Sequence, residues 1–149
     1  MDNKEFKNLF GRIAQINGFE RAFGGVFRES AECIIVLDLQ KSNYGNYYQL
    51  MIKIYVQGMF GNKYSISKDL VKRSGGNIFR GESPQFKDIF NLDILMDDHK
   101  RKQRMEELFE EFILPFIDKA LFRQGLRDLG ARGEVYLLPA VKQELDMLD

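Results

Sequence analysis

Three side chains in this sequence are of the types that perform nucleophilic or acid–base catalysis: Cys33, Ser42 and His99. A catalytic histidine needs a partner group that positions it inside a pocket. His99 instead lies in the charged run Asp97–Lys102, which is typical of the solvated first turn of a helix. Neither a nucleophile elbow nor a Cys-X-X-Cys motif surrounds Cys33, and its place on an apolar strand face disfavours a thiolate. We therefore expect no catalytic residue among them, which favours a non-enzymatic protein and leaves an enzyme as the alternative.

Metal and phosphate sites are not predicted either. With one His and one Cys in the chain, only carboxylates could hold a metal ion, and Asp93, Asp97 and Asp98 lack the spacing of a calcium loop. Helix capping accounts for these aspartates. The two Gly-Gly pairs lack the lysine and the strand-to-helix context of a nucleotide-binding loop. We expect no metal ion and no cofactor.

The charge balance bears on possible partners. The chain has 22 Lys and Arg against 22 Asp and Glu, so its net charge is zero and it has no overall field that attracts phosphate backbones. The basic run Lys100–Arg104 could contact phosphates locally, but a solvated first turn of a helix is the better explanation. The N-terminus lacks the features of a signal peptide, and no apolar run reaches membrane-spanning length. We expect a cytoplasmic protein without nucleic-acid or membrane partners, and a single cysteine fits that setting.

The elements that would position a site are organised around residues 33–57, in which two apolar runs flank a polar turn. Alternate residues of each run are apolar, which predicts two strands that share one buried face. The pairing that we expect places Leu39 opposite Tyr48 and Leu37 opposite Leu50. It leaves residues 42–45 as the loop. The buried face then comprises Cys33, Ile35, Leu37, Leu39, Tyr48, Leu50, Ile52, Ile54 and Val56.

The first part of the chain predicts a helix over about residues 3–17, where apolar residues recur at helical spacing before an Asn-Gly stop. Two short strands within residues 19–30 should follow. A two-residue turn at Gly24-Gly25 would place like charges opposite each other. We therefore prefer a three-residue turn, Gly24–Val26, which pairs Phe23 with Phe27.

Glycines interrupt every long pattern in residues 58–95. A connection of this length without secondary structure would be unusual in a compact domain. We expect a helical turn or two over residues 64–71, and a hairpin whose strands lie at 77–80 and 86–92.

The clearest helical signal begins at Asp97 and Asp98, because carboxylates favour the positive end of a helix dipole. We expect Pro115 to kink this helix or to end it near Leu114. Glycines 125, 130 and 133 should then break the chain into short pieces, before Pro139 opens a last helix. The core-facing stripe of the long helix is Met105, Leu108, Phe109, Phe112, Ile113, Phe116 and Ile117.

Four short motifs occur in an order and spacing that resemble the bacterial domain of unknown function 4304 family. The most specific is the Leu-Gln-Lys-Ser tetrapeptide at residues 39–42. The others are Gly18-Phe19, Tyr47-Tyr48 and Leu114-Pro115-Phe116. The resemblance implies a small bacterial α+β protein and brings no established activity. We expect one α+β domain over residues 1–149, with an N-terminal helix, an antiparallel meander sheet of four or more strands, and C-terminal helices packed on one face.

We call the hairpin predicted over residues 33–57 the central hairpin. Its second face mixes polar and apolar side chains. If it is exposed, this mixture is typical of a recognition patch. Alternatively, a late helix or residues 58–95 cover it. Our leading hypothesis is a non-enzymatic module that binds another protein, immunity- or adaptor-like by analogy only. The candidate contact residues are Asp38, Gln40, Lys41, Tyr44 and Tyr47.

Two alternatives stay open. One is a small-ligand binder or enzyme whose pocket lies between the sheet and the late helix, with Asp38, Gln40, Lys41 and Tyr47 converging there. The other is a homo-oligomer that buries a patch around Met51 and Tyr55.

Overall fold

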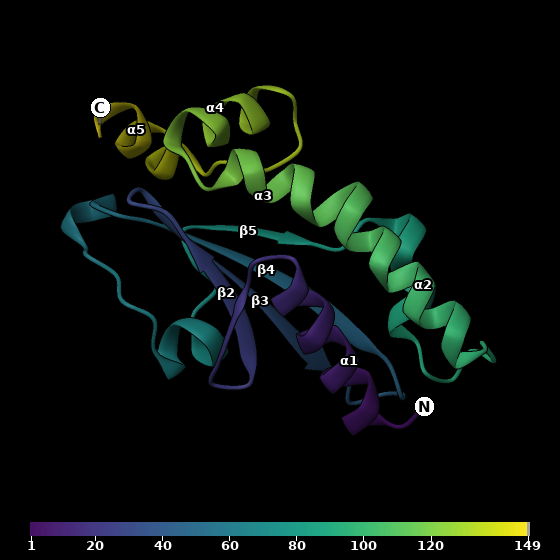
Figure 1. The fold of residues 1–149 in the computed structure, drawn as a ribbon. Helices are drawn as coiled ribbons and strands as arrows, with labels where there is room; N and C mark the ends of the chain where they lie inside the picture. Colours follow the sequence, from purple (N-terminus) through teal and green to yellow (C-terminus); the bar gives the residue numbers. More distant parts are fainter. Residues whose placement is uncertain (149) are drawn as a thin grey trace.

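Within residues 1–148, which the computed structural model describes, five antiparallel strands form one sheet in which each strand pairs with the next along the chain. The strands are β1 (Glu20–Ala22), β2 (Gly25–Glu29), β3 (Cys33–Lys41), β4 (Tyr48–Val56) and β5 (Ile78–Gly81). The α-helices are α1 (Asn3–Ile16), α2 (Asp98–Leu108), α3 (Leu114–Ala120), α4 (Arg123–Ala131) and α5 (Pro139–Met147). One helix precedes the meander and the others follow it (Figure 1), so the predicted α+β architecture is confirmed.

The central hairpin forms with the predicted buried face but in a different register. Leu39 pairs with Leu50 and Leu37 with Ile52, so β4 is displaced by two residues from the predicted pairing. A displacement of two residues keeps every side chain on its own face, because side chains alternate along a strand. The loop accordingly spans residues 42–47 and is closed by a hydrogen bond from the backbone N–H of Ser42 to the carbonyl oxygen of Tyr47 at 2.9 Å.

The turn between β1 and β2 also differs from the predicted one. Ala22 pairs with Gly25, which leaves Phe23 and Gly24 as a two-residue turn, both with positive φ (52° and 81°). Such turns suit the twist of a hairpin. Gly25 lies in β2 rather than in the turn. Glycine is needed at this position because a Cβ would lie 2.7 Å from a methyl carbon of Val71.

Helix α1 confirms the predicted N-terminal helix. Its first turn carries a capping box, in which the carboxylate of Asp2 accepts from the backbone N–H of Glu5 at 2.8 Å. The apolar face of α1 packs into the core, and Gly18 takes a positive φ of 92° just after the helix. This is the left-handed stop that the Asn-Gly pair predicts.

Residues 58–95 were predicted in part. Strand β5 confirms the strand expected near residues 77–80, while the helical turn expected over 64–71 lies slightly later, as a π-helical turn at Asp69–Arg73. The strand expected over 86–92 is wrong, because Pro84–Phe90 forms a 3-10 helix. Its buried residues, Phe86, Ile89 and Phe90, are spaced at three and four residues, which is a helical spacing.

The late helix does not end at Pro115. The chain stays helical from Asp98 to Ala120, through α2, a π-helical turn at Phe109–Ile113, and α3. The backbone N–H of Leu114 donates to Phe109, five residues back, so the wider turn accommodates the ring of Pro115. Within residues 1–148, no helix combines the length and the apolar character needed to cross a bilayer.

The last two helices correct one expectation and confirm another. Gly125 and Gly130 lie inside α4 rather than breaking the chain. Gly125 is needed there for close packing, since a Cβ would overlap the carbonyl oxygen of Lys119. Pro139 occupies the first turn of α5, as predicted, and Val141 and Leu145 are buried.

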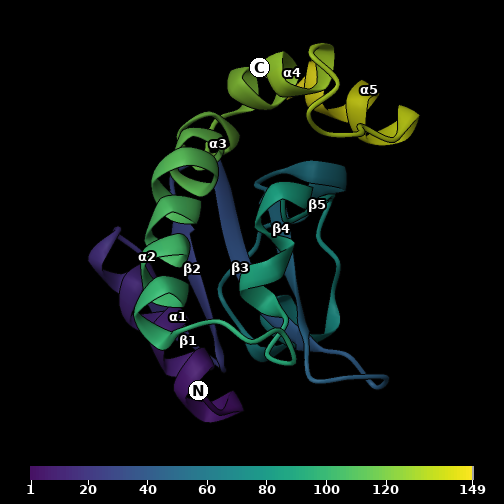
Figure 2. The ribbon, with the colours of Figure 1, turned by 90° about the vertical axis from the view of Figure 1, so that its right-hand side faces the viewer.

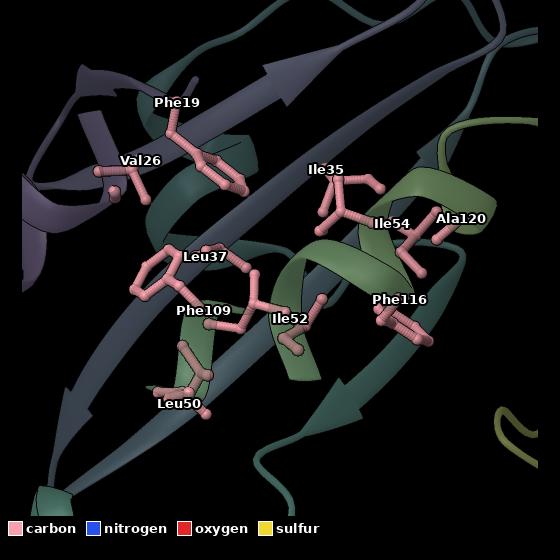
Figure 3. Close-up of a cluster of buried hydrophobic side chains, with 14 of the residues drawn as sticks. Phe19, Val26, Ile35, Leu37, Leu50, Ile52, Ile54, Phe109, Phe116 and Ala120 are labelled. Atoms are coloured by element: carbon pink, nitrogen blue, oxygen red, sulfur yellow. The ribbon is translucent and has the colours of Figure 1, made fainter. Parts of the chain in front are cut away.

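The main core lies between the sheet and the helices. Figure 3 shows side chains of β3 and β4, including Leu37 and Ile52, directed towards Phe109 and Phe116. The helical stripe predicted from the sequence is buried here, apart from the partly exposed Phe112. A smaller cluster lies on the opposite face of the sheet and comprises Phe27, Ile34, Val36, Tyr55, Leu70 and Val71.

The close packing of α4 generates a stability prediction. We expect Gly125→Ala to lower the free energy of unfolding by about 2–3 kcal/mol, because the new methyl group must displace backbone. Gly75→Ala is the matched control, since Gly75 has open space around it. Urea unfolding of both variants checks this, and an equal effect of the two substitutions would contradict it.

Candidate functional site

The loop between β3 and β4 carries Tyr44 and Tyr47, and Lys41 is the last residue of β3 before it. Tyr44 is 95% exposed, while Tyr47 is half-buried at the foot of the loop. The hydroxyl of Ser42 accepts from the backbone N–H of Tyr44 at 3.0 Å, which tightens the turn before the tyrosine. Figure 2 shows this loop projecting from one end of the sheet.

A second loop, residues 91–95, is bonded to the first. Tyr47 forms a β-bridge with Asn91, and the backbone N–H of Leu92 donates to Asn46 at 2.8 Å. The carboxylate of Asp93 accepts from the backbone N–H of Asn46 at 3.1 Å. We call residues 42–47 and 91–95 together the loop pair. Two apolar side chains of the second loop, Ile94 and Leu95, are exposed to solvent, Leu95 completely.

Arg101 fastens the second loop to α2. Arg101 is 3% exposed, and its guanidinium donates to the carbonyl oxygens of Ile89 at 2.6 Å, Asn91 at 3.2 Å and Ile94 at 3.0 Å. Burial lowers the pKa of Arg101, while its reference value is high enough to keep it charged. These bonds satisfy carbonyl groups that an irregular loop would otherwise leave without partners.

The basic run Lys100–Arg104 is therefore not the wholly solvated turn expected from the sequence. Arg101 points inward, and Arg104 donates to the carboxylate of Asp88 at 2.8 Å and lies over the ring of Phe86. His99 is exposed, and its backbone N–H donates to the capping carboxylate of Asp97 at 2.9 Å.

Asp38 lies apart from the other candidate residues. It is 1% exposed, and its carboxylate oxygens lie 2.6 Å from the ammonium of Lys72 and 3.6 Å from that of Lys53. Lys53, which is 2% exposed, also donates to the carbonyl oxygen of Val71 at 2.6 Å. Gln40 is exposed near the loop pair and pairs with Gln49 across the hairpin. The structure therefore brings Gln40, Lys41, Tyr44 and Tyr47 together and places Asp38 below the surface.

The second face of the sheet could be exposed or covered by another part of the chain. Its centre is covered. Residues 62–76 cross this face, and the hydroxyl of Tyr55 donates to the carbonyl oxygen of Leu70 at 2.6 Å. Val36 and Tyr55 are buried there, and Met51 stays partly exposed. The patch considered for a homo-oligomer is thus half covered by the chain itself.

The chemistry available to this arrangement is limited. Burial raises the pKa of the Cys33 thiol to about 12, which keeps it protonated and unreactive at neutral pH. Among the described residues, no group of three His, Cys, Asp or Glu side chains is placed to hold a metal ion. Core side chains, including Phe109 and Ile113, fill the space between the sheet and the late helix, where the sequence suggested a pocket.

The sequence analysis missed two parts of the candidate site and its support: the loop at residues 91–95 and the buried cations that hold the irregular segments. One signal was present for Arg101, which precedes Met105 by four residues and so extends the apolar stripe of the helix by one turn. The sequence also indicates that Lys53 could be buried, because it lies between Met51 and Tyr55 on the second face of β4.

A family model described as "Domain of unknown function (DUF4304)" matches residues 11–119. The matched span begins inside α1, contains the whole sheet and both loops of the loop pair, and ends in α3. Searches among curated proteins and among solved structures returned no match.

The buried thiol generates a prediction about pH. A thiol in the unfolded chain ionises near pH 8.5, whereas Cys33 in the folded protein ionises near 12. As the pH rises between these values, the unfolded state loses a proton that the folded state keeps, so stability falls. Between pH 8 and 10.5, we expect the free energy of unfolding to fall by about 2–3 kcal/mol more than in Cys33→Ala. Denaturant unfolding at both pH values measures this difference, and parallel pH profiles of the two proteins would contradict it.

The buried ion pair generates a second prediction. Asp38→Asn removes the carboxylate and leaves the Lys53 ammonium buried without its counter-charge, so we expect a loss of about 3–5 kcal/mol in unfolding free energy. The double variant Asp38→Leu, Lys53→Met removes both charges and should be more stable than Asp38→Asn. Urea unfolding measures both, and a double variant less stable than Asp38→Asn would show that the pair is not coupled in this way.

Proposed function

This chain belongs to the DUF4304 family, a domain of unknown function, and we propose that it is a non-enzymatic protein-binding module whose contact surface is the loop pair. The partner that we propose is another protein. The setting that we propose is the cytoplasm of a bacterium, which suits a chain whose single cysteine is a free thiol. An immunity or adaptor role is proposed by analogy alone.

The proposal rests on one observation: the loop pair holds large side chains fully in solvent on backbone that is fixed in place. Tyr44 is 95% exposed and Leu95 is fully exposed. Exposed apolar side chains on a connected surface are a feature of interaction sites. Tyrosine is also among the residues that most often dominate the binding energy of an interface.

The fixed backbone strengthens the proposal. Bonds between Asn46 and the second loop join the two halves, and Arg101 fastens the second loop to α2. A surface ordered before binding loses less conformational entropy when its partner docks. Loops held on a rigid scaffold are also where recognition residues concentrate.

The surroundings of the loop pair suit a polar rim. Gln40 and Lys41 at the end of β3, Asn43 in the first loop and Asp93 in the second are exposed. They include one cation, one anion and two amides, so the rim favours neither sign of charge. This composition fits a protein surface better than a phosphate backbone, which needs a local excess of cations.

The test is affinity capture of the tagged protein from lysate of its source organism, with Tyr44→Ala, Leu95→Ala beside it. We expect a stoichiometric partner that the double variant loses, because each truncation removes about 1–2 kcal/mol of binding energy, or roughly tenfold in Kd. Tyr47 is a less suitable target, because its ring packs against Gly45 and its removal would disturb the loop itself.

Tyr136→Ala is the matched control, since Tyr136 is 73% exposed but lies outside the loop pair. Retention of the partner by the control and its loss from the double variant would support the proposal. A partner bound equally by all three proteins, or no stoichiometric partner at all, would contradict it.

A further inference from the structure

We propose that a cavity between α1, the β1–β2 turn and β3 binds a small organic anion, in which an aromatic or alkyl body carries one carboxylate or similar anionic group. The cavity has a volume of about 530 Å³, which is within the usual range for small-molecule sites. Helix α1 lies against β1 and β2 on this side of the sheet (Figure 1). The lining shares no residue with the loop pair, so the two sites are separate.

Three cationic side chains surround the cavity: Lys7 from α1, Arg21 from β1, and Lys72 from the segment that covers the second sheet face. Among the described residues that line it, none is Asp or Glu. Asp38 does not line the cavity, but its carboxylate forms ion pairs with both Lys72 and Lys53. This cluster of one carboxylate and two ammonium groups therefore keeps a net positive charge. In a chain of zero net charge, this local excess favours an anion.

The placement of Arg21 involves an unusual feature of α1. Gly11 lies in the interior of this helix, where glycine is unfavourable relative to alanine. A Cβ at Gly11 would lie 2.6 Å from the central carbon of the Arg21 guanidinium. The missing side chain thus provides the space for the guanidinium, which donates to the carbonyl oxygen of Asn8 at 3.2 Å. Helix α1 therefore contains a glycine, which is unfavourable for a helix, at the position that contacts the Arg21 guanidinium.

A second unfavourable feature lies at the same cavity. Phe23, which lines it, has a φ of 52°, a conformation that bulky residues rarely adopt. Its ring is 53% exposed although the residue is large and apolar. Local backbone strain of this kind is found mainly at active sites, ligand-binding segments and switch regions. A phenyl ring at the rim of a cavity can pack on the apolar body of a ligand.

The apolar part of the lining determines the second half of the ligand. Phe10, Val26 and Leu37 are buried core residues, and Leu39 is half-buried beside them. These side chains offer no hydrogen bonds, so a fully polar anion such as phosphate would gain little from entering. An apolar body lying on Leu39 and Phe23, with its charged group near Arg21 and Lys7, satisfies both parts of the lining.

The test uses naphthalene-2-carboxylate as a probe and its uncharged analogue 2-naphthamide as the matched comparison, in titrations followed by calorimetry and by amide NMR. We expect saturable binding of the carboxylate at least tenfold tighter than that of the amide, with shifts of the amide signals of Gly24 and Gly25. Arg21→Gln should weaken carboxylate binding about tenfold or more, because it removes a charged hydrogen-bond donor. Inorganic phosphate should compete only weakly.

Arg12→Gln is the control variant, because Arg12 is exposed on the same helix but does not line this cavity. Gly11→Ala is a second test: its methyl group would displace the Arg21 guanidinium while favouring the helix, so the variant should melt no lower than wild type and bind the carboxylate more weakly. The proposal is overturned by equal affinity for carboxylate and amide, by unchanged binding in folded Arg21→Gln, or by no saturable binding at millimolar probe. Tyr44→Ala, Leu95→Ala should bind the probe as wild type does.

Discussion

An ammonium group inside a protein must find partners, and Lys53 finds one on the neighbouring strand and another outside the sheet. Its Nζ atom reaches the carboxylate of Asp38 on the next strand and the carbonyl oxygen of Val71 on a distant segment. Removing a charge from water is costly unless such partners are supplied. The segment over residues 62–76 therefore has a defined place on the second sheet face, although it contains little regular structure.

Arg101 acts on the main side of the molecule as Lys53 does on the second face. Lys53 donates to one carbonyl oxygen and Arg101 to several, in each case from backbone that forms no ladder with neighbouring strands. Irregular backbone needs hydrogen-bond partners just as helices and strands do. The two cations together explain how residues 58–95, with five interrupting glycines, can be well ordered on both sides of the sheet. Arg101 also holds the backbone of the second loop of the loop pair against α2.

The sequence was sufficient wherever a single element could be identified from its own periodicity. The face of the central hairpin, α1, the stripe of the late helix and the start of α5 all follow from such patterns. It failed where contacts from elsewhere made the choice. Gly25 is kept in a strand by the nearness of Val71, so the turn falls on Phe23. Gly125 lies in a helix because α3 passes close to it. For the site, Gln40, Lys41, Tyr44 and Tyr47 lie near one another as a strand-end cluster, but their neighbours at 91–95 and the burial of Asp38 depend on the tertiary fold.

The two outer strands of the sheet have a consequence for how copies of this protein meet. An open strand edge can recruit another chain and lead to aggregation. Here the outer strands are short, with three residues in β1 and four in β5. Each also carries an arginine that donates to backbone lying beside the sheet, Arg21 to Asn8 and Arg80 to Glu134. The long strands β3 and β4 lie inside, out of reach of a second sheet. The meander therefore ends in short edges that offer little open backbone to which a strand of another copy could add.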